Sequence, residues 1–117
     1  MFGYPDAQWN AAKEEMRQVL IARARDKGKI SYTELTGMVH IIHFSPDAAA
    51  FHHMLDEISR EENEAGRGML SVLVVHKAGD MMPGPGFFKL AKKLERDTSD
   101  REKCWVDEFN KVINSSR

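Results

Sequence analysis

The segment Pro83-Gly84-Pro85-Gly86 and the lysines that follow it carry the pattern best suited to binding an anion. Gly84 and Gly86 come just before a stretch with helical spacing, on which Lys89 is the first of three lysines. The first N–H groups of a helix have no acceptor inside the helix, and the helix dipole is positive at that end. We therefore expect this corner to bind a phosphate. In the alternative interpretation, the glycines only form a turn and the lysines only solvate the helix.

Tyr32 and Thr33 are the second pair of residues placed for binding. Ser31 and Glu34 have the spacing of a capping box, which predicts that a helix begins at this point. We expect Tyr32 and Thr33 to contact a phosphate there, and the glycine turn with its neighbouring lysines to act as a wing. The candidate binding residues are Tyr32, Thr33, Lys77, Gly84, Gly86 and Lys89.

The sequence lacks the patterns of the common catalytic and metal centres. It contains no Walker-type phosphate loop, no His-Glu-x-x-His motif and no nucleophile elbow. Cys104 stands beside Trp105 on an amphipathic stretch, which is typical of a packing residue rather than a nucleophile. The histidines have no cysteine among them and fit no usual zinc spacing: His40, His43, His52, His53 and His76. We expect no catalytic residue, no metal and no cofactor.

Hydrophobic spacing and turn residues predict the elements that would hold these residues. Trp9, Ala12 and Met16 recur at helical spacing, whereas Met69 to His76 is a nearly continuous apolar run that suits a buried strand. The expected order is a helix from the N-cap Asp6 until Gly28, an extended piece at 29–32, a short helix toward Ile42, a helix from Ser45-Pro46 until Gly66, a strand at 69–76, a turn at 83–86, a helix through 87–94 and a helix from the Ser99/Glu102 capping box.

Composition limits the architecture and the partners. A chain of 117 residues with 42% hydrophobic and 30% charged residues suits one globular domain, 1–117. The 17 basic and 18 acidic residues give a net charge of -1, so any binding to nucleic acid must use a local patch. One cysteine and the absence of a long apolar run predict a cytoplasmic protein outside the membrane. Nothing in the sequence fixes an oligomeric state.

The first four elements follow the order of a winged helix, so we expect an α+β, winged-helix-like domain with about five helices and a small β-sheet. The segment GKISYTEL, from Gly28 to Leu35, resembles the start of the DNA-binding half of alkyltransferase-like proteins. The reactive Pro-Cys-His-Arg motif of the alkylguanine-DNA alkyltransferases has no counterpart here, which excludes alkyl transfer. GRGMLSVLVVHK followed by PGPGFF is also similar to small, poorly characterised bacterial and phage proteins with a GRP-L-S-VV-K and PG-GFF pattern.

These patterns favour a non-enzymatic binding module that acts on nucleic acid or on a protein that handles it. A small enzyme or ligand-binding protein is the alternative, with a site for a phosphorylated small molecule between His76 and the PGPGFF turn. A third hypothesis is a module that only docks on a protein, through Met81-Met82 or the acidic stretch at 56–64. The acidic stretch weighs against DNA, because it would repel phosphates.

Overall fold

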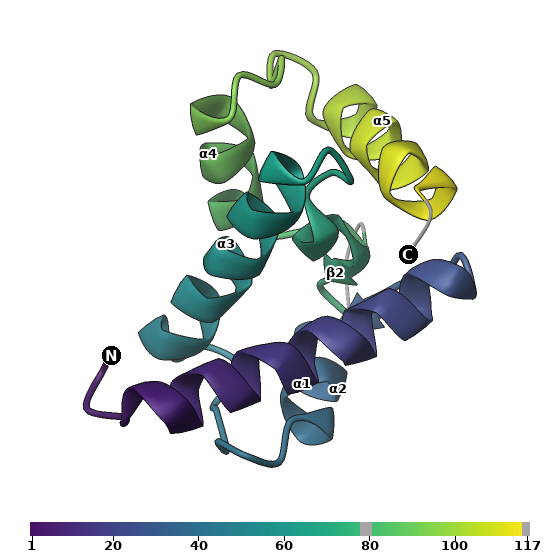
Figure 1. Cartoon of the computed structure of the whole chain (residues 1–117). Coiled ribbons are helices and arrows are strands. Elements are labelled where there is room, and N and C mark those ends of the chain that lie inside the picture. Colours follow the sequence, from purple (N-terminus) through teal and green to yellow (C-terminus); the bar gives the residue numbers. More distant parts are fainter. Residues whose placement is uncertain (78–80, 116–117) are drawn as a thin grey trace.

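The computed structural model describes residues 1–77 and 81–115. Over these residues the chain forms five α-helices, one 3₁₀ helix and a sheet of two strands, which confirms the expected α+β class (Figure 1). The elements are α1 (Asp6–Arg25), β1 (Ile30–Ser31), α2 (Tyr32–Met38), α3 (Ala49–Glu64), η1 (Leu70–Leu73), β2 (Val74–Val75), α4 (Pro85–Lys93) and α5 (Arg101–Asn114). No helix in the described part of the chain is long and apolar enough to cross a membrane.

The core surrounds η1, which α1, α3 and α5 all contact. Leu70, Val72 and Leu73 of η1 are fully buried and belong to one connected hydrophobic cluster. Figure 1 shows β2 near the centre, with α1 beneath it and α5 above it. The two short strands and the loops that leave them are therefore held in place by three helices, which gives a rigid base for the residues that follow β1 and β2.

Only the end of the predicted strand at 69–76 is a strand. Its first part is the 3₁₀ helix η1, and Val74–Val75 alone pairs with β1. Side chains satisfy the backbone of η1, because the Ser71 N–H donates to Ser59 Oγ (2.9 Å) and Trp105 Nε1 donates to the Val72 carbonyl (3.1 Å). A continuous apolar run shows burial but does not distinguish a strand from a buried helical turn.

The strands pair in parallel, with Ile30 opposite Val74 and Ser31 opposite Val75. The order helix, strand, helix, helix agrees with the sequence analysis. A wing is a β-hairpin, in which neighbouring strands run antiparallel. The described residues contain no such hairpin, so the winged-helix part of the expectation stays a prediction.

Local polar contacts decide where several helices begin and end. The predicted capping box is confirmed, since the Glu34 N–H donates to Ser31 Oγ (3.0 Å) and the Ser31 N–H to Glu34 Oε1 (3.4 Å). Helix α2 ends at Met38 instead of continuing to Ile42, because Glu15 of α1 accepts the N–H groups of His40 (2.9 Å) and Ile41 (3.0 Å).

Three of the predicted helix starts are shifted. Pro5, rather than Asp6, is the N-cap of α1, and it makes no side-chain bond. Helix α3 begins at Ala49 rather than after Ser45, because residues 45–48 form a separate turn. In this turn the Ala48 N–H donates to the Ser45 carbonyl (3.0 Å). Asp100 caps α5 by accepting from the Lys103 N–H (3.0 Å), and Ser99 instead donates to Asp97 (2.7 Å).

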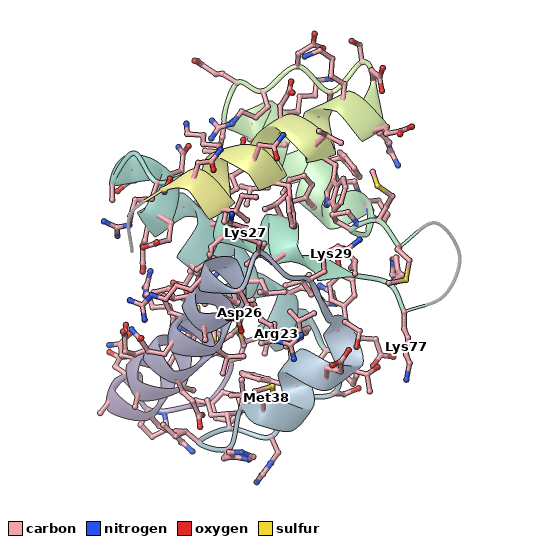
Figure 2. All side chains as sticks on the ribbon, turned by 90° about the vertical axis from the view of Figure 1, so that its right-hand side faces the viewer. Arg23, Asp26, Lys27, Lys29, Met38 and Lys77 are labelled. Carbon is pink, nitrogen blue, oxygen red and sulfur yellow. The ribbon has the colours of Figure 1, made fainter. Side chains whose placement is uncertain are left out.

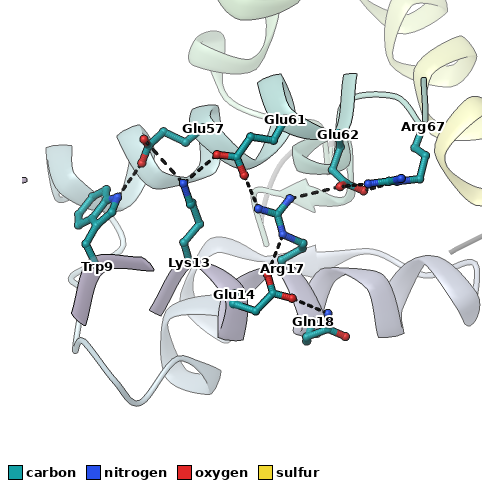
Figure 3. Close-up of polar contacts among 9 residues, drawn as sticks. All are labelled: Trp9, Lys13, Glu14, Arg17, Gln18, Glu57, Glu61, Glu62 and Arg67. Atoms are coloured by element: carbon teal, nitrogen blue, oxygen red, sulfur yellow. Dashed lines mark hydrogen bonds and ion pairs between the residues drawn. The ribbon is translucent and has the colours of Figure 1, made fainter. Parts of the chain in front are cut away.

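A row of polar contacts joins α1 to α3 (Figure 3). Trp9 Nε1 donates to Glu57 Oε1 (2.7 Å), and Lys13 Nζ to Glu61 Oε2 (2.8 Å). The buried Glu62 accepts from Arg17 (3.2 Å) and from Arg67 (2.7 Å). Three carboxylates of the acidic stretch at 56–64 are therefore engaged within the fold, which reduces the repulsion expected toward DNA: Glu57, Glu61 and Glu62.

Candidate functional site

Tyr32 lies where four segments of the chain meet. It follows β1 directly, and its hydroxyl oxygen accepts a hydrogen bond from the Gly84 N–H (2.9 Å) at the start of α4. Its ring packs against the rings of His52 on α3 and His76 after β2, with centroid distances of 5.6 and 5.1 Å. Burial raises the pKa of the Tyr32 hydroxyl, so this group stays protonated and retains a hydrogen to donate.

We call the hollow on one side of Tyr32 the inner pocket. It measures about 220 Å³, and aromatic and apolar side chains make up most of its wall. Its residues come from α2, α3, η1 and the start of α4 as well as from the loop after β2: Tyr32, His52, Leu55, Asp56, Ser71, His76, Gly84, Pro85, Gly86 and Phe87. It lies between His76 and the PGPGFF turn, where the ligand-binding alternative places its site.

Two polar groups of the inner pocket have unused hydrogen-bonding capacity. The half-buried Asp56 carboxylate has no hydrogen bond or ion pair with any residue in the described part of the chain. Burial raises its pKa, although the charges of Arg60 and His53 act in the other direction. The Ser71 hydroxyl oxygen accepts a hydrogen bond from the Ser59 hydroxyl (2.6 Å). The backbone N–H of Ser71 donates to Ser59 Oγ (2.9 Å). Neither bond uses the hydrogen of the Ser71 hydroxyl.

A second pocket of about 280 Å³, which we call the outer pocket, adjoins the inner pocket at Tyr32. It shares Tyr32, His52 and His76 with the inner pocket. Its other residues are Ser31, Thr33, Pro46, Asp47 and Lys77. Asp47 adds a negative charge to this pocket, and a hydrogen bond from the Ser45 hydroxyl lowers its pKa. The charge of Lys77 acts on Glu34, whose pKa is lowered mainly by hydrogen bonds with Ser31 and also by this ammonium. The pocket therefore combines one ammonium, one carboxylate and two imidazole rings.

The start of α4 is a weaker anion site than its sequence indicates. The Gly84 N–H already donates to Tyr32, the Phe87 N–H bonds to the Gly84 carbonyl (3.2 Å), and Pro85 has no N–H. Among these first groups of α4, the Gly86 N–H is left without an acceptor in the described residues. A side chain at Gly84 would press on both rings, because a Cβ there would lie 3.2 Å from His76 Nε2 and 3.4 Å from the Tyr32 hydroxyl.

Five of the six predicted binding residues line one of the two pockets. Tyr32, Gly84 and Gly86 line the inner pocket, and Tyr32, Thr33 and Lys77 line the outer one. Lys89 lines neither. It lies on α4, which Figure 1 places on the left, away from the side of the molecule that Figure 2 shows.

The sequence analysis did not assign His52, Asp56 or Ser71 to the site, although all three line the inner pocket. His52 and Asp56 are four residues apart on α3, so they share a helix face, and this spacing was the available signal. Ser71 gives no comparable signal, because η1 was expected to be part of a strand. The site therefore contains more groups able to bind a ligand than the six residues predicted.

A basic face lies beside the outer pocket (Figure 2). It contains Lys27 and Lys29 after α1 and Lys77 after β2, which lie on one side of the molecule. Arg23 is on the same side, but it is engaged by the Lys29 carbonyl (2.8 Å) and by Glu34 (3.7 Å). Asp26 is the acidic residue that Figure 2 labels among these cations. We call Lys27, Lys29 and Lys77 the basic face.

Two other features bear on the remaining hypotheses. A hollow of about 440 Å³ is lined by Met81, Met82 and Trp105, among others, where the docking hypothesis places its contact. Cys104 is buried, and burial raises the pKa of its thiol, so it is a poor nucleophile. Among the described residues, no group of three or more metal-binding side chains converges.

Comparison with known proteins gives no family for this chain. No protein-family model matches it, and no curated protein or solved structure resembles it significantly. The resemblances to alkyltransferase-like proteins and to bacterial and phage proteins therefore stay predictions. The function has to be inferred from the two pockets and the basic face themselves.

Proposed function

We propose that this chain is a non-enzymatic nucleic-acid-binding module, whose phosphate contacts lie at the outer pocket and along the basic face. The observation that carries the proposal is the position of Lys27, Lys29 and Lys77 on one side of the molecule. Of these lysines, Lys77 lines the outer pocket together with Thr33 and Tyr32. Lysines that neutralise phosphates supply most of the sequence-independent affinity for nucleic acid. A local cluster can do this even though the chain has a net charge of -1.

The size of the pockets favours an extended ligand over an enclosed one. Sites for small molecules usually measure about 300 to 1,000 Å³ and bury most of the ligand. The inner and outer pockets measure about 220 and 280 Å³ and adjoin one another. A ligand at these pockets would place only a part of itself inside each and would continue over the surface, as a nucleic acid strand does.

The arrangement of α3 supports a winged-helix-like mode of binding. His52, near the N-terminal end of α3, lines both pockets, whereas Glu61 and Glu62, near the C-terminal end, are paired with α1 and Arg67. The N-terminal part of the third helix is the part that reads DNA in helix-turn-helix proteins. We therefore place the ligand across this end of α3 and the start of α2.

One observation favours a second candidate function, a binding protein for a phosphorylated small molecule. The inner pocket lies between His76 and the PGPGFF turn and contains Asp56 and Ser71, which both retain hydrogen-bonding capacity. Thermal-shift measurements with mononucleotides and sugar phosphates separate the two functions. Stabilisation by one of these compounds without binding to any oligonucleotide would favour the small molecule.

The proposed function is tested by reversing charge on the basic face. We expect Lys27→Glu/Lys77→Glu to weaken binding to a fluorescent oligonucleotide at low salt, and to reduce the slope of log K against log [salt] by about one for each phosphate that is no longer neutralised. Fluorescence anisotropy at several salt concentrations measures both quantities. Lys89→Glu is the matched control, because it changes charge on α4, and we expect it to bind as the unmodified chain does.

Two results would contradict this assignment. Unchanged affinity and salt dependence in Lys27→Glu/Lys77→Glu would remove the basic face from the site. An equal loss of affinity in that variant and in Lys89→Glu would show that binding depends only on the overall charge of the chain, and that no particular face binds the oligonucleotide.

A further inference from the structure

The Asp56 carboxylate is the group in the inner pocket that points most clearly to a ligand. It is half-buried, and it has no hydrogen bond or ion pair within the described part of the chain. Removing part of a carboxylate from water without supplying a donor costs free energy, and most polar groups that are buried in proteins have a partner. An ionised carboxylate has acceptors only, so the ligand that completes this pocket must present N–H or O–H donors.

The walls of the pocket suit a flat ring. Tyr32, His52, His76 and Phe87 contribute aromatic rings, and Leu55 and Pro85 contribute apolar surface. Nucleobases bind proteins by stacking on such rings while their edges form hydrogen bonds. The volume of about 220 Å³ is below the usual range for a whole small-molecule ligand, which favours one ring system over a larger compound.

We propose that the inner pocket receives a guanine base, with its Watson–Crick edge toward Asp56. This inference rests on the proposed function, because it names the nucleic-acid component that the site selects. Guanine presents two adjacent donors on that edge, N1–H and the N2 amine, to which one carboxylate can bind through both oxygens. In adenine and cytosine a ring acceptor adjoins the amine, and in thymine two carbonyls flank the single N–H, so these acceptors would face the Asp56 oxygens.

The remaining polar groups agree with this orientation. The Ser71 and Tyr32 hydroxyls each retain a hydrogen that can be donated to an acceptor of the base. The outer pocket, with Thr33 and Lys77, lies across the shared wall of Tyr32, His52 and His76. A base in the inner pocket and its phosphate in the outer pocket are thus adjacent, as they are in a nucleotide. A base can enter only when it is unpaired, so the ligand is single-stranded or has a flipped base.

The test compares short thymine-rich DNA strands that differ in one central base. We expect a strand with a central guanine to bind about tenfold more tightly than the same strand with adenine or cytosine, the discrimination typical of one bidentate pair. Hypoxanthine keeps N1–H and lacks the N2 amine, so its strand should bind with intermediate affinity. A duplex containing the same guanine should show no preference over other duplexes. Guanosine monophosphate in the same assay shows whether a free nucleotide suffices.

Asp56→Asn is the deciding variant, because its amide cannot accept both guanine donors. We expect it to bind all strands with equal affinity and to keep its fold, since Asp56 has no partner to lose among the described residues. Asp47→Asn removes the same charge from the outer pocket and is the matched control. It should bind every strand at least as well as the unmodified chain and keep the preference for guanine.

The outcomes separate the base pocket from the proposed function. Binding without preference for guanine, or a preference that persists in Asp56→Asn, would overturn the guanine pocket, while weaker binding by Lys27→Glu/Lys77→Glu would still support the nucleic-acid function. Binding of guanosine monophosphate that depends on Asp56, with no binding to any strand, would support the guanine pocket and overturn the nucleic-acid function. No binding to any of these ligands would overturn both.

Discussion

Asp56 is a side chain whose charged form lowers the stability of the fold, because the carboxylate is half-buried. Burial raises the pKa of this carboxyl, because transfer of the charged form out of water is unfavourable. Because the pKa of Asp56 is higher in the folded state, its protonated form favours folding. This contribution to the free energy of unfolding is fully present at pH values below the pKa of an unfolded aspartate. That contribution is lost as the pH rises through the folded-state pKa. Residues that are kept in spite of such a cost are typical of binding sites.

Asp56→Asn should therefore be more stable than the unmodified chain at neutral pH. The difference in the free energy of unfolding should narrow in acid and disappear where aspartates are protonated in both the folded and the unfolded state. Urea unfolding at several pH values measures this difference. An Asn variant that is less stable at neutral pH would indicate that Asp56 has a favourable partner, which would also remove the reason to expect a ligand at this carboxylate.

The ends of three helices follow one pattern but use different residues. In α1, α3 and α4 the residue after the C-cap has a positive φ, and two N–H groups bond back to the last turn. This is the Schellman motif, in which glycine is the usual residue. Gly66 occupies that position after α3, with a φ of +80°, whereas Lys27 and Glu95 adopt φ values of +55° and +68° after α1 and α4.

A pair of substitutions measures the cost of this conformation. Glu95→Gly should stabilise the fold by about 0.5 to 1 kcal/mol, because a side chain is strained in the left-handed region. Gly66→Ala should destabilise it by about 1 kcal/mol, through backbone strain alone, since a Cβ there meets no atom within 4 Å. Thermal or urea unfolding gives both values. We expect the two substitutions to change the free energy of unfolding in opposite directions. A change in the same direction would contradict the explanation by backbone strain.

The sequence predicted the elements better than it predicted their boundaries or their packing. The capping box at Ser31 and Glu34 was predicted correctly because it is a local pattern whose two bonds involve only neighbouring residues. The run at 69–76 was misassigned because Ser59 and Trp105, far away in the sequence, satisfy its backbone. Tyr32 and Gly84 were each predicted for the site, but no local pattern indicated that they would bond to each other.

At the scale of the whole molecule, Glu108 connects the last helix to the rest of the fold. Its buried carboxylate accepts from the Met69 N–H (2.7 Å) and from Arg96 Nε (2.8 Å). Arg96 also donates to Asn63 at the end of α3 (2.6 Å). Burial alone would raise the pKa of Glu108, but these hydrogen bonds and the charge of Arg96 outweigh it and lower the pKa. Helix α5, α3 and the start of η1 are thus joined through one ion pair.

Glu108→Ala should destabilise the fold by about 3 kcal/mol, because it leaves Arg96 and a buried N–H without their acceptor. Urea unfolding near neutral pH measures the loss. Because the pKa of Glu108 is lowered, its contribution is present above the pKa of an unfolded glutamate and is lost as the pH falls through the folded-state pKa. Asp107→Asn, which breaks the exposed pair with Lys103 on the same helix, should cause no measurable change. Equal effects of the two variants would contradict the role of Glu108.

The parallel pairing of β1 with β2 also constrains the order in which the chain can assemble. Parallel neighbours cannot be joined by a tight turn, and here α2, α3 and η1 lie between them in the sequence. Such long-range pairing forms slowly, because the chain loses the conformational entropy of closing a long loop before the contacts between the strands can stabilise it. On the ribosome, Tyr32 emerges well before the segments that carry His76 and Gly84. A nascent or shortened chain that stops before α4 contains every residue of the outer pocket, but it lacks Pro85, Gly86 and Phe87 and therefore has no complete inner pocket.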